Sequence, residues 1–220
     1  MNIYVIVEGE KATKKIYKTW IPCINKSLSH VDYIHNIQKH NFFILAGYGQ
    51  PEMMARIEKA VGDVNKITQF DRLVIAIDSE DVEPREKKIE VSARVDRIGS
   101  RVEVKYVIQH FCLETWLLGN KATFRKKTRD PELIKYMALF DVRTNDPALL
   151  PNDTKQSWNR SQFAFQYLRA GIRDIYDGRK SYTKRNPGPA ATVNYFDLVK
   201  KRCLDEKHIL SFHGFLDAFV

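Results

Sequence analysis

The stretch YVIVEGEKATKKIYKTWIP, residues 4–22, decides the fold. It begins within Ile3–Val7, a continuous apolar run rich in β-branched residues, which is typical of a strand buried on both faces of a parallel sheet. Apolar residues then recur at helical spacing as far as Trp20, and we expect Pro22 to end that helix. Glu8 lies between the strand and the helix. Three roles are open for its carboxylate at this position: it is solvated, it caps the helix, or it binds a positive group.

The same alternation of apolar strand and amphipathic helix continues to about residue 118. Further strands are predicted at 42–46, 72–78 and 102–108, with helices after Pro51, over 84–98 and in the short stretch that Gly119 ends. In 102–108 apolar and charged residues alternate, which favours a half-exposed edge strand. Strand–helix repeats with short connections predict an α/β fold of Rossmann-like type, with a mainly parallel sheet flanked by helices.

The rest of the chain, residues 119–220, has a different pattern. Helical periodicity recurs at 131–139, 160–176, 194–203 and 208–219, without further strands. The net charge of the chain is +9, and residues 111–220 carry 19 Lys and Arg against 12 Asp and Glu. We therefore predict a catalytic α/β core at 1–118 and a helical, basic extension at 119–220 that packs on it. A basic surplus favours polyanionic partners.

Several protein classes are disfavoured by the composition. No apolar run approaches the roughly 20 residues that a membrane-spanning helix needs, and the N-terminus lacks a secretion signal. Three scattered cysteines fit neither a disulfide framework nor a zinc-binding spacing. These features predict a cytoplasmic protein with no membrane partner.

Acidic side chains follow two predicted strands at the end where each strand stops. Glu8 follows the first strand, Asp78 ends the third, and Glu80 and Asp81 come directly after it. Open parallel sheets bind ligands beyond the carboxyl ends of their strands, so these acids converge if the two strands are neighbours. Crowded carboxylates repel unless a proton or cation lies among them, and oxygen ligands of this kind suit Mg²⁺ or Mn²⁺. Alternatively, each acid caps the helix that follows it.

Four stretches, in this order, resemble the Toprim domain, the catalytic core of topoisomerases, bacterial primases and OLD-type nucleases. They are IVEGEKATKKIY (6–17), AGYGQP (46–51), IAIDSED (75–81) and CLETWLLGN (112–120). Within that group they look most like the RloB-like proteins, small Toprim proteins of bacterial defence loci that are often encoded beside an ABC-type ATPase. The resemblance covers the core, residues 1–118, and implies a Toprim-like sheet.

The resemblance also implies roles for the acids. Glu8 matches the Toprim glutamate that binds metal or acts as general acid or base, and Asp78 matches the first acid of the DxD motif. Glu80 falls where the family usually has the second Asp, and Asp81 is an alternative ligand. Glu114 matches an acid that OLD and RloB-like proteins carry after the fourth strand; otherwise it is a surface acid. The implied catalytic set is Glu8, Asp78 and Glu80, with Mg²⁺ or Mn²⁺ as cofactor.

Two basic stretches in the second half are candidates for nucleic-acid binding: KATFRKKTR (121–129) and GRKSYTKRNPG (178–188). Phosphate contacts supply most sequence-independent affinity, and an aromatic ring among basic residues can stack on an unpaired base. The alternatives are solvated charge or contact with a partner protein. The residues predicted to contact nucleic acid are Lys11, Arg125, Lys126, Lys127, Arg179, Lys180, Tyr182, Lys184 and Arg185.

These features and the resemblance predict a metal-dependent Toprim nuclease that cuts DNA or RNA in antiviral defence. A partner ATPase of the ABC/AAA type is implied, since this chain has no GxxxxGK[ST] loop, and self-association as a homo-oligomer stays open. Two alternatives remain. One is a non-catalytic Toprim-like module that binds nucleic acid or a partner, and the other is a nucleotide-binding regulatory domain on a Rossmann-like sheet.

Overall fold

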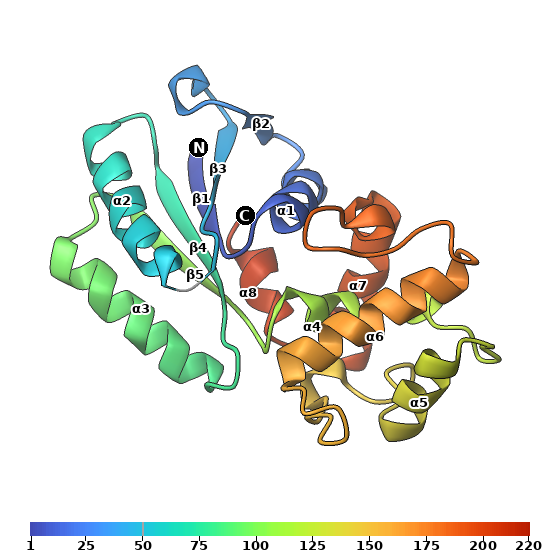
Figure 1. Ribbon diagram of the computed structural model, residues 1–220. Helices are drawn as coiled ribbons and strands as arrows, with labels where there is room; N and C mark the ends of the chain where they lie inside the picture. The colour runs from blue at the N-terminus through green and yellow to red at the C-terminus, as the bar shows by residue number, and fades with distance from the viewer. Residues whose placement is uncertain (50) are drawn as a thin grey trace.

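The computed structural model describes residues 1–49 and 51–220; Gln50, in the glycine turn AGYGQP, lies outside them. Five parallel strands form one sheet in the order β2-β3-β1-β4-β5 (Figure 1). The strands are β1 (Ile3–Val7), β2 (Ser29–Val31), β3 (Asn41–Ala46), β4 (Arg72–Asp78) and β5 (Glu103–Gln109). The predicted α/β class with a parallel sheet is confirmed.

Strand β1 lies at the centre of the sheet and pairs with β3 on one side and β4 on the other. The register places Val7 opposite Ala46 in β3 and opposite Ala76 in β4. All three strands therefore stop at the same carboxyl edge. The acids were expected to converge if the strands that carry them are neighbours, and this condition is met because β1 and β4 are adjacent.

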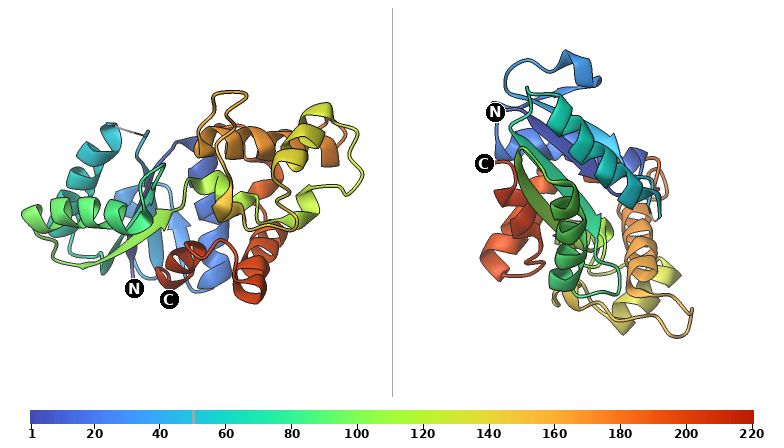
Figure 2. Two further views of the ribbon diagram at one scale, coloured as in Figure 1. Left: turned by 90° about the horizontal axis from the view of Figure 1, so that it is seen from below. Right: turned by 90° about the vertical axis from the view of Figure 1, so that its left-hand side faces the viewer.

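Helices cover both faces of the sheet (Figures 1 and 2). On one face, α2 (Glu52–Lys66) and α3 (Pro84–Ile98) pack in the cluster that holds Tyr4 and Ile6 of β1. On the other, α1 (Lys11–Ile24) and α8 (Phe212–Asp217) pack in the cluster that holds the alternate β1 residues Ile3, Val5 and Val7. Side chains of a strand point to opposite faces in turn, so a wholly apolar β1 is what burial on both sides requires.

The second half of the chain is helical and lies on the α1 face. One hydrophobic cluster runs from Val5 in the sheet through Trp116 to Phe163 and Phe196 in the C-terminal helices. These are α4 (Leu113–Leu117), α5 (Pro131–Leu139), α6 (Arg160–Ile175) and α7 (Val193–Glu206), with short 3-10 turns at Lys121–Thr123, Pro147–Leu149 and Gly188–Ala191. A further 3-10 turn, Ile34–Asn36, lies between β2 and β3. Because the cluster is continuous, the extension shares its core with the sheet.

Three local predictions differ from the structure. Pro22 does not end α1, which runs on to Ile24, because a proline in the last turn removes only one backbone hydrogen bond while the buried Trp20 and Ile21 hold the helix in place. The three-residue edge strand β2 was not predicted. Helix α8 is shorter than the 208–219 pattern. In the described ranges, no helix combines the length and the apolar character that crossing a membrane requires.

Candidate metal and phosphate site

Two carboxylates meet at the carboxyl edge of the sheet. The Asp78 backbone N–H donates to Glu8 Oε2 at 3.0 Å, and the Leu113 N–H donates to Asp78 Oδ1 at 3.1 Å. Each side chain is therefore held by one of its two oxygens. Among the described residues, the other oxygen of Glu8 and of Asp78 accepts no hydrogen bond. Both side chains line an open cleft, so these oxygens are available to a ligand.

The turn after β1 needs a glycine. Gly9 has φ +94°, in the left-handed region, and a Cβ built on it would lie 2.6 Å from Thr13 Oγ1. Its carbonyl oxygen accepts the Tyr48 N–H at 3.4 Å, which ties this turn to the one after β3. The VEGE motif therefore requires glycine at position 9, because the chain must turn sharply between Glu8 at the sheet edge and the start of α1 at Lys11.

The acids are electrostatically crowded. Burial raises the pKa of Glu8, and the negative charge of Glu80 adds to this against the opposing hydrogen bond from the Asp78 backbone. Burial raises the pKa of Asp78 still more strongly, and the charge of Glu8 comes next among the causes. The charged forms of both carboxyl groups are therefore disfavoured, and a proton or a cation bound in the cleft would reduce their mutual repulsion.

The cleft has a volume of about 360 Å³, enough for several water molecules or a hydrated cation with a phosphate group. Both acidic and basic side chains line it. Its lining residues are Glu8, Gly9, Glu10, Thr13, Tyr48, Gly49, Asp78, Glu80, Leu113, Lys184 and Arg185. The two basic residues come from the loop before the 3-10 turn at Gly188–Ala191, far along the chain from the acids.

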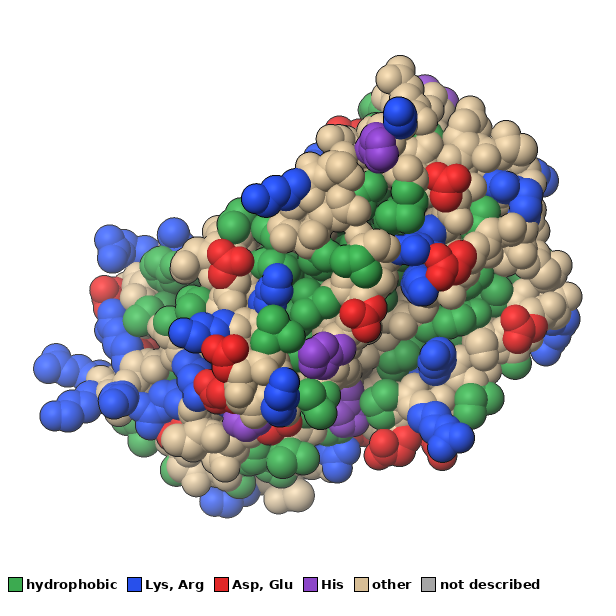
Figure 3. All heavy atoms as spheres, turned by 180° about the vertical axis from the view of Figure 1, so that it is seen from behind, with side chains coloured by type: hydrophobic (Ala, Val, Ile, Leu, Met, Phe, Trp, Pro, Cys, Tyr) green, Lys and Arg blue, Asp and Glu red, His purple; other side chains and the backbone are tan. Residues whose placement is uncertain are grey.

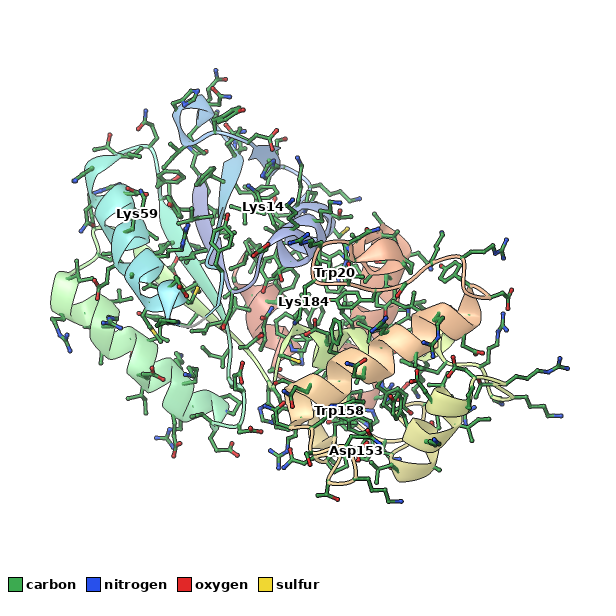
Figure 4. All side chains as sticks on the ribbon, viewed as in Figure 1. Lys14, Trp20, Lys59, Asp153, Trp158 and Lys184 are labelled. Atoms are coloured by element: carbon green, nitrogen blue, oxygen red, sulfur yellow. The ribbon has the colours of Figure 1, made fainter. Side chains whose placement is uncertain are left out.

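Glu114, behind the cleft, is already neutralised. Its side chain is 1% exposed, and its Oε1 accepts from Lys184 Nζ at 2.7 Å and from the Tyr182 hydroxyl at 2.8 Å. Burial alone would raise the pKa of Glu114, but the charge and hydrogen bond of Lys184 lower it overall. Figure 4 shows Lys184 between the sheet edge and the C-terminal helices. Lys184 therefore supplies an internal positive charge beside the acids.

Tyr182 does not fit the role predicted for it. Its ring is 1% exposed and packs edge-on against Phe165, and its hydroxyl is used by Glu114. A buried ring cannot stack on an incoming base. The stacking role is therefore wrong for Tyr182, which instead orients Glu114. The predicted metal role of Glu114 is limited to Oε2, which is buried and has no hydrogen-bond partner among the described residues.

The remaining acids differ in position. Glu80 is exposed, lines the cleft, and has φ +53°, which is uncommon for a residue with a side chain. Asp81 is exposed and is not among the cleft's lining residues. Over residues 1–49 and 51–220, no three acidic, histidine or cysteine side chains converge as a preformed metal centre. Glu8 and Asp78, with Glu80 next to them, have the oxygen donors and the uncompensated charge that suit Mg²⁺ or Mn²⁺.

The predicted nucleic-acid contacts fall into separate places. Lys184 and Arg185 line the acidic cleft, and Lys11 lines a groove beside it. Arg125 and Lys127 line a different hollow of about 600 Å³, where Arg125 pairs with Asp177 at 3.0 Å. Arg179 and Lys180 line a third one, of about 540 Å³, and Lys126 is exposed outside all of these. On the face in Figure 3, Lys and Arg side chains gather over the C-terminal helices, at the left.

Two features of the site were not predicted. Tyr48 lines the cleft, and its signal in the sequence is an aromatic residue between two glycines in AGYGQP. Ser79 and His110 lie next to Asp78 and the start of α4, with Ser79 Oγ 3.2 Å from His110 Nδ1. Burial lowers the pKa of His110. Ser79 is fully buried, so its hydroxyl is not presented to a substrate.

No family model, curated protein or solved structure matches this chain.

Proposed function

We propose that this protein is a metal-dependent phosphodiesterase of the Toprim type that cuts DNA or RNA. The observation that carries the proposal is the pair Glu8 and Asp78, two half-buried, mutually repelling carboxylates at the carboxyl ends of adjacent parallel strands. The Asp78 backbone N–H donates to Glu8 Oε2 at 3.0 Å and ties the two strand ends together. Each keeps one oxygen for a ligand. This placement agrees with the resemblance of the VEGE and DSED motifs to Toprim sequences.

The acidic and the basic side chains of the cleft have different roles in this proposal. Glu8 and Asp78, with Glu80 at the rim, would hold Mg²⁺ or Mn²⁺, which when bound polarises a phosphate and lowers the pKa of an attacking water. Lys184 and Arg185 line the same cleft, where they would draw a phosphate toward the acids. Glu114, which accepts the Tyr182 hydroxyl, holds the Lys184 ammonium in position. Glu8, whose pKa burial raises, is also the general acid or base that the Toprim resemblance implies.

The test is cleavage with matched variants. Purified protein is incubated with plasmid DNA, single-stranded DNA and RNA in Mg²⁺, Mn²⁺ or EDTA, with and without the product of any ATPase gene found beside its own. We expect cuts that need the metal and that Glu8→Gln and Asp78→Asn abolish while circular dichroism shows intact folding. Asp81→Asn is the matched control, since that acid lies outside the cleft lining, and it should cut like the wild type. Cleavage that survives both Glu8→Gln and Asp78→Asn would refute the proposal.

A second function is favoured by one specific contact. Lys184 Nζ lies 2.7 Å from Glu114 and already offsets part of the negative charge, so a non-catalytic module that binds nucleic acid or a partner protein would need no metal. Binding without cutting in every condition above would favour this module. The roles in antiviral defence and with an ATPase partner rest on the resemblance, and the neighbouring gene is their simplest test.

A further inference from the structure

Tyr48 is a large aromatic residue that stays 53% exposed at the rim of the acidic cleft. It lies between Gly47 and Gly49 in the turn that follows β3. It lines both the acidic cleft and a second groove of about 250 Å³, and Glu10 is also shared by the two. The two hollows therefore adjoin at Tyr48.

The backbone and one neighbour hold this ring in place. Tyr48 has φ +63°, a left-handed conformation that glycine adopts more easily than a residue with a bulky side chain. The Arg56 guanidinium carbon lies 4.4 Å from the ring centroid, and Arg56 Nη1 donates to the Ala46 carbonyl at 3.1 Å. Glycine at this position would make the turn with less strain. A tyrosine that keeps the strained backbone, with its ring exposed and in contact with Arg56, therefore indicates that the aromatic ring has a function such as binding a ligand.

The second groove has a basic surplus. Lys11 and Lys14 come from the first turn of α1, and Arg56 comes from α2 (Figure 4 labels Lys14). Two acids also line it, Glu10 and Asp32. The Asp32 carboxylate is already paired with Lys18 at 3.4 Å. A chain of phosphates leaving the acidic cleft would therefore meet cations on the far side of Tyr48.

We propose that these two hollows hold a single-stranded polynucleotide, with one unpaired base stacked on Tyr48 and the next phosphates against Lys14 and Arg56. In a duplex both faces of each base are covered by its neighbours, so the ring could stack only after unpairing; single strands, DNA or RNA, are thus preferred over duplex. The inference rests on the proposed function, whose substrate class it names.

The experiment measures binding without cleavage, so that the two proposals fail separately. Fluorescence anisotropy is recorded in EDTA at low salt with a labelled single-stranded DNA, an RNA of the same sequence, and the matching duplex. Tyr48→Gly removes the ring and suits the left-handed backbone, and Tyr48→Phe keeps the ring. Tyr33→Ala is the matched control, because Tyr33 is 63% exposed and lines neither hollow. Circular dichroism checks that each variant is folded.

We expect the wild type to prefer single strands, and Tyr48→Gly to weaken single-strand binding by between about 5-fold and 100-fold. Duplex binding should be unchanged, and Tyr48→Phe and Tyr33→Ala should bind like the wild type. In a series of single strands each lacking one base, the gap that removes the stacked base should abolish the difference between Tyr48→Gly and wild type. Equal single-strand affinity of wild type and folded Tyr48→Gly, an equal loss on duplex, or no binding to any polynucleotide would overturn the inference. The DNA and RNA arms show which strand is bound.

Discussion

Lys184→Met gives a sharp test of the charge arrangement behind the cleft. The substitution removes the ammonium 2.7 Å from Glu114 Oε1 but keeps an apolar side chain against Phe165. Removing one partner of a fully buried ion pair costs about 3–5 kcal/mol, whereas an exposed pair contributes about 0.2–1 kcal/mol. Glu114 is 1% exposed, but the Lys184 side chain is 64% exposed, so water can approach the remaining carboxylate. We therefore expect a loss of about 2 kcal/mol at neutral pH.

The partner variant should behave differently. In Glu114→Gln the amide oxygen still accepts the Tyr182 hydroxyl and Lys184 can extend into solvent, so the loss should stay below about 1 kcal/mol. Lys184→Met combined with Glu114→Gln should be nearly as stable as Glu114→Gln alone, because no buried charge is then left unpaired. Urea unfolding followed by circular dichroism measures all four proteins.

The pH dependence supplies an independent check on the same pair. In the wild type the folded-state pKa of Glu114 is lowered, so its contribution is present above the ordinary glutamate pKa and is lost as the pH falls through the folded-state value. The difference between wild type and Lys184→Met should therefore shrink in acid. If Glu114→Gln costs as much as Lys184→Met, or if the double variant is additive, the ion pair does not hold the site as described.

Three further outcomes follow from the site and its surroundings. Because the folded-state pKa values of Glu8 and Asp78 are raised, the stability of the wild type should fall as the pH rises from the ordinary carboxyl pKa through the raised values. Glu8→Gln and Asp78→Asn should each remove the part of this fall that comes from the substituted group, and each should be more stable than the wild type at pH 8 by about 1 kcal/mol or more. Urea unfolding at several pH values measures this. Mn²⁺ at about 100 times its Kd should stabilise the wild type by about 2.7 kcal/mol in a thermal-shift assay and leave Asp78→Asn unchanged, and an equal shift in both would contradict the site. Gly9→Ala should destabilise the protein by about 1–3 kcal/mol, since its Cβ would meet Thr13 Oγ1 at 2.6 Å and its φ is +94°; a thermal melt like that of the wild type would show that the turn relaxes freely.

The core of the fold was readable because its determinants are local. A wholly apolar β1 predicts burial on both faces, and Pro84 with the spacing of Val91 and Val95 predicts α3 with the bounds that the structure has. Strand β2 was not readable, since its three residues, SHV, form no apolar run and join the sheet by backbone pairing to β3. Its existence depends on an edge that only the folded sheet provides.

The site was readable only in part, for a similar reason. Parallel strands share a carboxyl edge, so motifs at the ends of two strands predict that Glu8 and Asp78 meet. The contact from Lys184 to Glu114 spans 70 residues of sequence and depends on how the C-terminal loop returns to the sheet. Basic residues around Tyr182 suggested an exposed, base-stacking loop, whereas packing against the core buries the ring. Composition identifies a charged loop but not which of its side chains point inward.

Manganese binding followed by electron paramagnetic resonance tests the central claim most directly. Free Mn²⁺ is titrated into wild type, Asp78→Asn and Asp81→Asn without nucleic acid, so that neither a substrate nor an activating partner is needed. We expect the wild type and Asp81→Asn to bind Mn²⁺ with similar affinity and Asp78→Asn to bind at least about 10-fold more weakly. Equal affinity in all three proteins, or no binding by the folded wild type, would contradict a cation held between the ends of β1 and β4.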